Sequence, residues 1–267
     1  MKKDLSIIIP VGNDWRIITC LESIQKQKSN LSIEVIIVDS FCSKDLINAI
    51  KSFKANFDII LVKKYSKKIG LLRNTGLKNI SSNIIYFIDS DCILEKDAIK
   101  QAYKSGIQNL VTRGYIKFQG NKSRISKLDS VLRQQRYDSD KHFAYCPNLV
   151  LQKRLFEKIG LYKENYYYGS DGEFAKRIKD SNIDSEYNSF LKLIHLAPIP
   201  DSRIIKTWIR YGEGRYKRMR NSSFKEKLKA LYQPNLFDFS KSFAYNLVFF
   251  SCLCCRWYGW IKAYLKK

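Results

Sequence analysis

The stretch from residue 83 to residue 92, NIIYFIDSDC, carries five consecutive apolar residues followed by two aspartates that one serine separates. Apolar runs of this length, rich in β-branched residues, are typical of strands buried on both faces of a sheet. Three similar runs precede it, at Ser6–Pro10, Glu34–Asp39 and Asp58–Val62. Amphipathic stretches separate the runs. This alternation predicts parallel strands joined by helical crossovers, and therefore an α/β fold.

The amphipathic stretches themselves predict helices. Ile17, Leu21 and Ile24 share one helical face in the first stretch, and Ser43 is a suitable N-cap for the second. The third crossover, Gly70–Asn79, also reads as a helix. Further along we expect helices at Ala98–Ile107, Ser130–Arg136, Lys153–Ile159 and Asp171–Lys179, strand pieces at Leu110–Thr112, Tyr115–Phe118 and Asn148–Leu151, and a loop at Gln119–Ser126.

The chain of 267 residues is long enough for one sizeable core with a small appendage, and its formal net charge is +23. A charge of this size indicates a polyanionic partner, which could be nucleic acid, anionic lipid or a phosphorylated substrate. From Arg203 to the end there are 15 basic and 3 acidic residues. We therefore predict a catalytic domain at residues 1–200 and a basic, aromatic helical extension at residues 201–267.

The N-terminus and the cysteines favour a protein that is not exported. The apolar run before Pro10 is too short for the hydrophobic region of a signal peptide, so we expect a cytoplasmic location. Seven cysteines form no disulfide framework, and we expect free thiols. The cluster of Cys252, Cys254 and Cys255 lacks the second cysteine pair that a structural zinc site needs.

Asp89 and Asp91 are the sharpest chemical signal, because a buried strand delivers both carboxylates to the edge of the sheet. In open α/β sheets, ligands bind at the carboxyl ends of the strands. Two carboxylates spaced in this way suit Mn²⁺ or Mg²⁺, which complete their coordination with phosphate oxygens and water. The alternative is an aspartate-rich turn that only caps the next helix.

Three other segments offer polar groups to the same site. Arg73, on the crossover before this strand, suits a phosphate or a nucleobase, although it could also be an ordinary surface arginine. Asp171 lies at the start of a predicted helix with Glu173, where acids commonly interact with the helix dipole, or it acts as a general base. His195 ends an apolar run and is either a core histidine or a third metal ligand.

Four segments in series, SIIIPVGNDWRIITCLESIQKQ, EVIIVDSFCSKD, GLLRNTGL and YFIDSDC, closely resemble the motifs of glycosyltransferase family 2, whose members have the GT-A fold. The similarity extends over roughly residues 5–200. It implies a Rossmann-like mixed sheet flanked by helices, and an inverting transfer of a sugar from a nucleotide-diphosphate donor to an acceptor hydroxyl. The donor implied by the resemblance is a UDP-sugar.

The resemblance also implies roles for individual residues. Pro10, Asp39 and Arg73 would line the nucleotide pocket, with Asp39 accepting a hydrogen bond from the base. The family's DxD motif matches Asp89-Ser90-Asp91, in which Asp91 would bind Mn²⁺ or Mg²⁺ and Asp89 would contact the ribose or metal-bound water. The general base falls at Asp171, a metal-binding histidine falls at His195, and acceptor contacts fall at Asn148 and Glu173. Ser170 departs from the family's Glu-Asp pair, and Ser40-Phe41-Cys42-Ser43 departs from its Asp-Gly-Ser pattern.

The C-terminal segment KSFAYNLVFFSCLCCRWYGWIKAYLKK contains an uncharged run of 14 residues, which is shorter than the roughly 20 that span a bilayer. With its tryptophans and flanking lysines it suits a helix lying on anionic lipid, at the inner face of the cell membrane, where a glycan or lipid-linked glycan would be the acceptor. The alternative is a helix docked on the core or on a partner chain of a homo-oligomer. Two alternative functions are a nucleic-acid-binding protein and an inactive family member that acts as a membrane assembly partner. For the glycosyltransferase itself, no nucleic-acid partner is expected.

Overall fold

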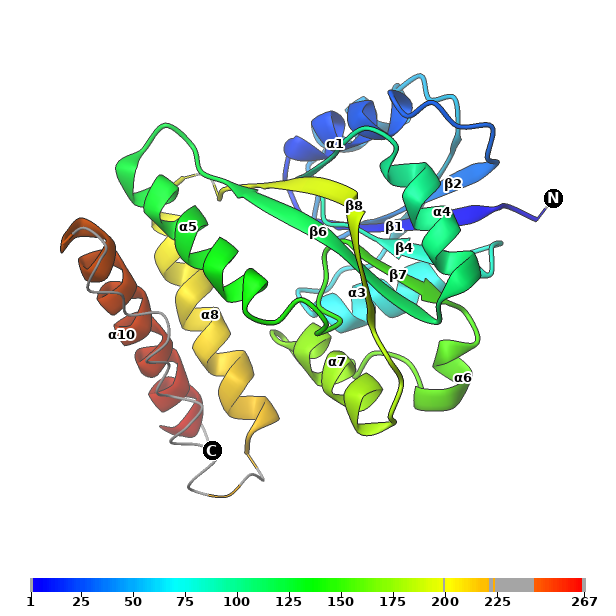
Figure 1. The fold of residues 1–267 in the computed structure, drawn as a ribbon. Helices are drawn as coiled ribbons and strands as arrows, with labels where there is room; N and C mark the ends of the chain where they lie inside the picture. The colour runs from blue at the N-terminus through cyan, green and yellow to red at the C-terminus, as the bar shows by residue number, and fades with distance from the viewer. Residues whose placement is uncertain (1, 199, 221–222, 224–242, 266–267) are drawn as a thin grey trace. The chain divides into compact units, whose positions relative to one another are not determined.

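The computed structural model describes residues 2–198, 200–220, 223 and 243–265. Within these residues one mixed sheet has eight strands in the order β3-β2-β1-β4-β7-β6-β8-β5 (Figure 1). The strands are β1 (Leu5–Val11), β2 (Ile33–Asp39), β3 (Asp58–Lys63), β4 (Ile84–Phe87), β5 (Cys92–Leu94), β6 (Val111–Gln119), β7 (Leu149–Gln152) and β8 (Glu186–Leu196). The predicted α/β fold, a mixed sheet flanked by helices, is confirmed.

The first half of the sheet is parallel, as the alternation of strands and helices predicts. β1 pairs in parallel with β2 and β4, and β2 pairs in parallel with β3. All seven residues of β1 are buried, which agrees with a central strand. The expectation that Asp58–Val62 is buried on both faces is wrong, because β3 is the edge strand and its residues are only half-buried or exposed.

The second half of the sheet is antiparallel, and β7 pairs with both β4 and β6 in this way. The two expected strand pieces at Leu110–Thr112 and Tyr115–Phe118 form the single strand β6. Gly114, in the middle of β6, allows this continuity, because a Cβ there would lie 2.4 Å from Nδ2 of Asn148. Glycine is therefore the residue that lets β6 pass this close to Asn148 and to the carbonyl of Leu191 in β8.

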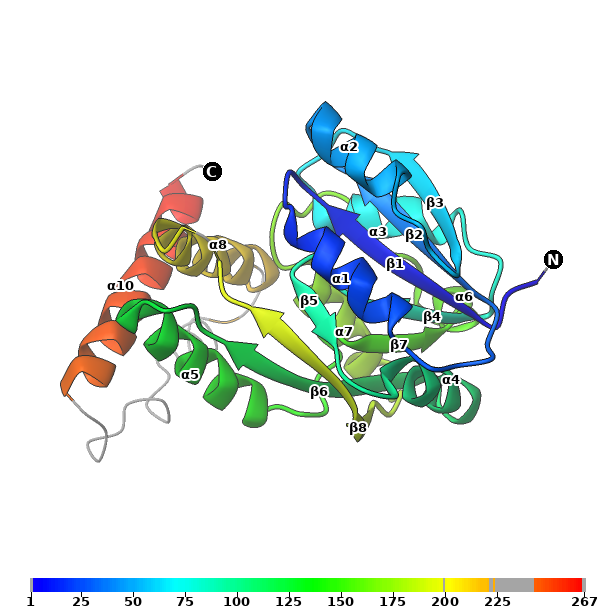
Figure 2. The same cartoon turned by 90° about the horizontal axis from the view of Figure 1, so that it is seen from above.

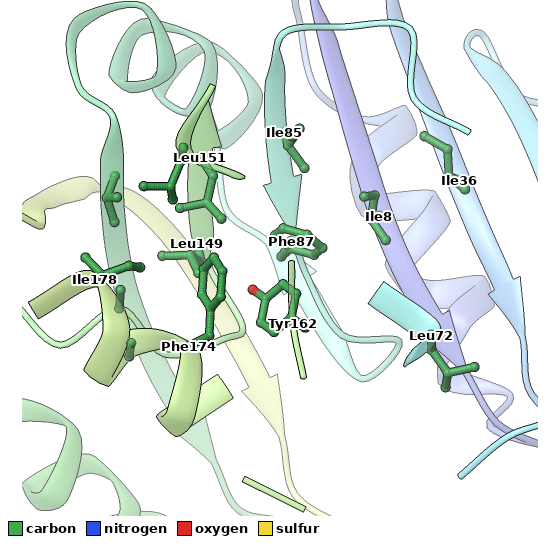
Figure 3. Packing of buried hydrophobic residues seen from close by; sticks show 14 of the residues in the cluster. Ile8, Ile36, Leu72, Ile85, Phe87, Leu149, Leu151, Tyr162, Phe174 and Ile178 are labelled. Carbon is green, nitrogen blue, oxygen red and sulfur yellow. The ribbon is translucent and has the colours of Figure 1, made fainter. Parts of the chain in front are cut away.

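Helices cover both faces of the sheet. They are α1 (Arg16–Gln25), α2 (Lys44–Lys51), α3 (Ile69–Leu77), α4 (Ala98–Gln108), α6 (Leu155–Ile159) and α7 (Ser170–Asp180). Leu72 of α3 and Phe174 of α7 pack with Ile8, Ile85 and Phe87 in one buried cluster (Figure 3). α1 lies on the opposite side of β1 from α3 (Figure 2). Because these helices cover the faces of the sheet, the carboxyl ends of the parallel strands are the place where a ligand can bind.

A second compact unit contains α5 (Arg124–Asp138), α8 (Ser202–Arg218) and α10 (Phe243–Leu265). Its core joins the three helices through Leu132, Ile204, Trp208, Phe249 and Cys252. The indole Nε1 of Trp208 donates a hydrogen bond of 2.7 Å to Asp129 of α5. The expected helical extension is confirmed for α8 and α10, and residues 221–222, 224–242 and 266–267 of it lie outside the described residues.

The sequence did not indicate that α5 belongs to this unit, since residues 118–140 fall inside the predicted domain 1–200. The start of α5 also differs from the expected Ser130, because Ser123 caps the helix and accepts a hydrogen bond of 3.0 Å from the backbone N–H of Ser126. The loop expected at Gln119–Ser126 is correspondingly short. The polar residues of this segment suggested a loop, but Ser123 acts as an N-cap and starts the helix there.

Glycines allow α8 and α10 to touch along their backbones. A Cβ added at Gly212 would lie 2.0 Å from the carbonyl oxygen of Arg256, and one at Gly259 would lie 2.1 Å from that of Ile209. The two helices therefore approach more closely than any larger residue permits at these points.

Replacing Gly212 by alanine should destabilise the packing of α8 against α10 by about 1–3 kcal/mol, the usual range for overpacking. Urea unfolding followed by tryptophan fluorescence measures this change, because Trp208 and Trp260 lie in this unit. Gly12→Ala is the control, since the nearest atom to its new Cβ is 3.8 Å away. Equal unfolding midpoints for both variants would contradict the close approach.

Candidate active site

The ends of β1 and β2 form the first part of the candidate site. Val11 lies opposite Asp39 in the register of these two parallel strands. The carbonyl of Ile8 accepts a hydrogen bond of 3.3 Å from the backbone N–H of Ile88, and the pairing of β1 with β4 ends there. The backbone of Pro10, two residues later, points to the same side as that of Ile8, where β1 no longer pairs with β4. The missing N–H of Pro10 therefore breaks no hydrogen bond between strands. Pro10 and Asp39 are both buried at the edge where the sequence predicts the nucleotide pocket.

Asp39 is held in a defined position at the end of β2. Its side chain is 4 % exposed, and Oδ1 accepts a hydrogen bond of 2.9 Å from the backbone N–H of Cys42. The hydroxyl of Ser40 donates a hydrogen bond to the carbonyl of Ser66 and ties the following turn to the segment before α3. This loop therefore keeps the Asp39 carboxylate fixed, which suits recognition of a hydrogen-bond donor such as the edge of a base.

Arg73 projects from α3 as a buried cation with unused donors. Its Nη2 lies 3.7 Å from Oδ1 of Asp89, and its guanidinium lies 5.4 Å from the ring centre of Tyr162. The Nε and Nη1 atoms are buried and have no hydrogen-bond partner within the described residues. Buried donors are almost always satisfied in proteins, and a guanidinium with two such donors suits an anionic ligand with several oxygens.

Burial alone would lower the pKa of Arg73, because it disfavours the charged form. The neighbouring Cys146, Tyr162, Asp89 and Asp171 raise it, and the pKa lies above the ordinary arginine value. Arg73 therefore stays a cation, which is the state that binds phosphate.

The turn Asp89-Ser90-Asp91 joins β4 to β5 and separates its two carboxylates. Asp91 lies with His195, since Cys92 of β5 is opposite His195 of β8 and the His195 Nε2 is 3.6 Å from Oδ1 of Asp91. Asp89 is instead directed to Arg73. Ser90 is 8 % exposed between them. The structure thus brings the predicted ligands Asp91 and His195 together, and leaves Asp89 outside this group.

The group around Asp91 fits a divalent cation. One ligand atom each from Asp91, Cys92 and His195 lies within 4.8 Å of the others. The Asp91 Oδ1 atom is buried without a hydrogen-bond partner among the residues that the structure describes. A carboxylate and an imidazole are ligands that Mn²⁺ accepts, and Mg²⁺ binds through one or two carboxylates together with phosphate oxygens. The donor set therefore fits the metal that the DxD resemblance implies.

Two residues next to Asp91 were not singled out from the sequence. Cys92 contributes its sulfur atom to the group, and burial raises the pKa of this thiol well above its usual range. Arg16, at the start of α1, has its Nη2 atom 2.5 Å from Asp14 and 3.4 Å from Oδ2 of Asp91. The signal for Cys92 was its place directly after the aspartates, whereas nothing in the local sequence points Arg16 toward Asp91.

The carboxyl group of Asp89 is electrostatically unusual. Burial raises its pKa, the charge of Arg73 opposes this effect, and Asp91 adds to it, so that the pKa lies above the ordinary aspartate value. Two carboxylates in one turn repel each other, and a bound cation would relieve this repulsion. The electrostatics of the turn therefore also favour a bound metal.

Asp171 reaches the same region from the first turn of α7. Gly70 of α3 makes this possible, because a Cβ there would be 2.8 Å from the carbonyl of Lys163 and 3.1 Å from Cβ of Ser170. The Asp171 carboxylate accepts a hydrogen bond of 2.8 Å from the backbone N–H of Gly172. Its charge acts on both Arg73 and Asp89, so the predicted base lies in the electrostatic range of the other site residues.

The two residues expected at the acceptor site are engaged within the protein. Glu173 is buried, and its carboxylate binds Arg177 at 2.9 Å and Lys163 at 2.9 Å. Asn148 is fully buried, where Oδ1 accepts from the hydroxyl of Tyr86 and Nδ2 donates to the carbonyls of Tyr115 and Leu191. Both side chains hold neighbouring segments in place, and the contacts with an acceptor stay predictions.

Comparison with known sequences identifies the family. The model of glycosyl transferase family 2 matches residues 6–160, which is more than half of the chain. Glycosyltransferase AglE of Haloferax volcanii is 24% identical over 220 residues, which cover 79% of this chain and 72% of AglE. Poly(ribitol-phosphate) beta-N-acetylglucosaminyltransferase TarP of Staphylococcus aureus is 29% identical over 111 residues, 40% of this chain and only 34% of TarP.

Solved structures show the same fold. TarS 1–349 of S. aureus in complex with UDP-GlcNAc has a TM-score of 0.60 at 17% identity, and the match covers 86% of this chain and 70% of that one. The mannosyltransferase PcManGT of Pyrobaculum calidifontis, in complex with GDP-Man and Mn²⁺, has a TM-score of 0.60 at 13% identity, and the match covers 99% of this chain and 74% of that one. The family match, over the strands and turns that carry Asp39, Arg73 and Asp91, shows that this protein belongs to glycosyl transferase family 2 and is a glycosyltransferase.

Proposed function

We propose that this protein transfers a sugar from a nucleotide-diphosphate sugar, with a UDP-sugar as the first donor to test, to an acceptor hydroxyl. One observation carries the proposal: the buried donors of Arg73 and the buried Oδ1 of Asp91 both lack hydrogen-bond partners within the described residues. A diphosphate with a divalent cation supplies what each of them needs. The phosphate oxygens would accept hydrogen bonds from the guanidinium, and the carboxylate of Asp91 would coordinate the cation.

In this proposal the two aspartates of the DxD turn have different roles. Asp91 and His195 would hold Mn²⁺ or Mg²⁺, and Asp89, beside Ser90, would contact the ribose or metal-bound water. A metal held there would supply positive charge against the negative charge that develops on the leaving diphosphate. Pro10 and Asp39 line the pocket for the base, and Arg73 binds the phosphates. The UDP-GlcNAc and GDP-Man complexes of proteins with the same fold support a nucleotide-sugar donor.

Asp171 acts as the general base in a single displacement. Its carboxylate takes the proton of the acceptor hydroxyl while that oxygen forms a bond to C1 of the sugar. The bond from C1 to the phosphate oxygen breaks, and the nucleoside diphosphate leaves with the electron pair. One displacement inverts the anomeric centre. The hydrogen bond from Gly172 orients the Asp171 carboxylate for this proton transfer.

The acceptor is a glycan or lipid-linked glycan in the synthesis of bacterial surface polymers, and the enzyme works on the inner face of the cell membrane. Support comes from TarP, whose name describes a transferase of N-acetylglucosamine to poly(ribitol-phosphate). Asn148 and Glu173 would influence the acceptor through the segments that they hold. No helix among the described residues is long and apolar enough to cross a membrane.

The first experiment is calorimetric titration of UDP into the full chain with and without Mn²⁺, followed by a screen of UDP-sugars for hydrolysis and transfer. We expect UDP binding to depend on Mn²⁺, because a cation held by Asp91 would attract the diphosphate. UDP binding without any hydrolysis or transfer would favour an inactive family member. Absence of UDP binding under both conditions would contradict a UDP-sugar donor, and the titration would then be repeated with GDP.

A further inference from the structure

The helix α10 exposes a continuous uncharged face. Seven large apolar or aromatic side chains along it are 38–74 % exposed: Leu247, Phe250, Trp257, Tyr258, Ile261, Tyr264 and Leu265. Ser251 and Cys254 are the other exposed residues of this face. At 1.5 Å per residue the face is about 27 Å long. We refer to these nine residues as the α10 face.

The opposite side of α10 is already used. Phe249 and Cys252 belong to the core with α5 and α8, and Trp260 is buried against Tyr216 of α8. The two charged residues within α10 do not reach the α10 face: Arg256 is buried, and Lys262 pairs with Glu213 of α8 at 3.1 Å. A surface helix ordinarily carries charges opposite its buried side. The α10 face therefore has the composition of an interaction surface.

We propose that the α10 face lies on the surface of an anionic lipid bilayer. Trp257, Tyr258 and Tyr264 are the side-chain types that concentrate at the boundary between lipid and water. Helices that lie in this boundary bury one apolar face to a depth of roughly 5–10 Å and need no spanning length. This fits a helix that is too polar to cross a membrane but carries no charge on its outer face.

The charge of the unit decides between lipid and a second copy of the chain. The unit that contains α10 has 20 basic and 7 acidic residues. Arg203, Lys206, Arg210 and Lys217 of α8 are all exposed and recur at spacings that put them on one side of the helix. A symmetric dimer through α10 would bring two such basic units together, and like charges oppose that contact. Anionic lipid attracts the same cations, by about 1 kcal/mol for each residue near the surface.

This inference sharpens the location proposed above by naming the surface that binds, and it does not depend on the sugar transfer. The test is co-sedimentation of the full chain with vesicles of phosphatidylcholine alone or mixed with phosphatidylglycerol. We expect strong binding only with phosphatidylglycerol, weakened by added salt because screening reduces the attraction to surface charge.

Two matched variants identify the face. Ile261→Glu and Ile107→Glu replace the same residue type, at 54% and 58% exposure, and change the net charge equally. Ile107 lies on α4, in the other unit. We expect Ile261→Glu to weaken vesicle binding by at least about tenfold, because it replaces an exposed isoleucine that the lipid would bury. We expect Ile107→Glu to bind as the unchanged protein does.

Equal binding by the two variants, or no binding to phosphatidylglycerol vesicles, would overturn the proposal. So would a dimer of the unchanged protein that Ile261→Glu dissociates in sedimentation velocity, since a second copy would then cover the face. Calorimetry with UDP on both variants shows separately whether the donor site is intact. Vesicle binding can therefore fail while the proposed donor site stands, and the reverse result is equally visible.

Discussion

Replacing Asp91 by asparagine is expected to abolish the metal-dependent part of UDP binding and to remove sugar transfer with it. Asparagine has the same shape but no charge, and a neutral amide oxygen is a much poorer ligand for a hard cation than a carboxylate. Replacement of outer residues around a metal commonly weakens metal binding by about 10–100-fold, so loss of a direct ligand should exceed that range. Titration of Mn²⁺ and of UDP with Mn²⁺ measures the two effects separately.

Asp97→Asn is the matched control for this prediction. Asp97 lies six residues further along the chain, is exposed, and has a backbone φ of 62° that asparagine also tolerates. The same charge is removed, but outside the group formed by Asp91, Cys92 and His195. We expect Asp97→Asn to bind Mn²⁺ and UDP normally. If Asp91→Asn kept its metal-dependent binding, the cation would have to be held elsewhere.

Asp171→Asn is expected to lower the turnover number by about 10²–10⁴ while UDP binding stays unchanged. The range is the typical contribution of a positioned general base. Asparagine keeps the size of the side chain and can still accept a hydrogen bond from Gly172, but it cannot take the acceptor proton. A loss confined to turnover separates a role in the chemical step from a role in binding.

The control for Asp171 is Asp180→Asn, at the other end of α7. Asp180 is exposed and pairs with Lys176, and exposed pairs of this kind contribute little to stability. Its replacement should leave turnover and UDP binding as they are. If Asp171→Asn retained near-full turnover in the same assay, another group would have to accept the proton.

The local sequence was sufficient to predict the parallel half of the sheet and the residues at its edge. Apolar runs specify β1, β2 and β4, and parallel strands bring their carboxyl ends to one side. Asp39 and the turn from Asp89 to Asp91 therefore had to lie near each other. In the structure β1 pairs in parallel with both β2 and β4, so the carboxyl ends of these strands do share one edge of the sheet.

The local sequence pattern could not predict contacts between segments that are distant along the chain. The antiparallel register of β5 and β8 places His195 opposite Cys92, so the sulfur atom joins the group only in the folded chain. Asn148 illustrates the same limit. The sequence suggested an acceptor contact, but β4, β6 and β8 surround its amide and use its hydrogen-bonding atoms.

The C-terminal helix shows the division most clearly. Composition alone predicted a basic, aromatic helix and left open whether it contacts lipid or packs on the protein. Both sides of α10 are apolar, so periodicity could not say which side is covered. Close backbone contact at Gly212 and Gly259 determines that one side packs on α8 and the other stays exposed.

The sequence by itself determined the elements and the chemistry of the strand ends, because these follow from the local pattern of apolar residues. Only the tertiary structure decided which faces and side chains remain available, because packing between distant segments takes up the rest.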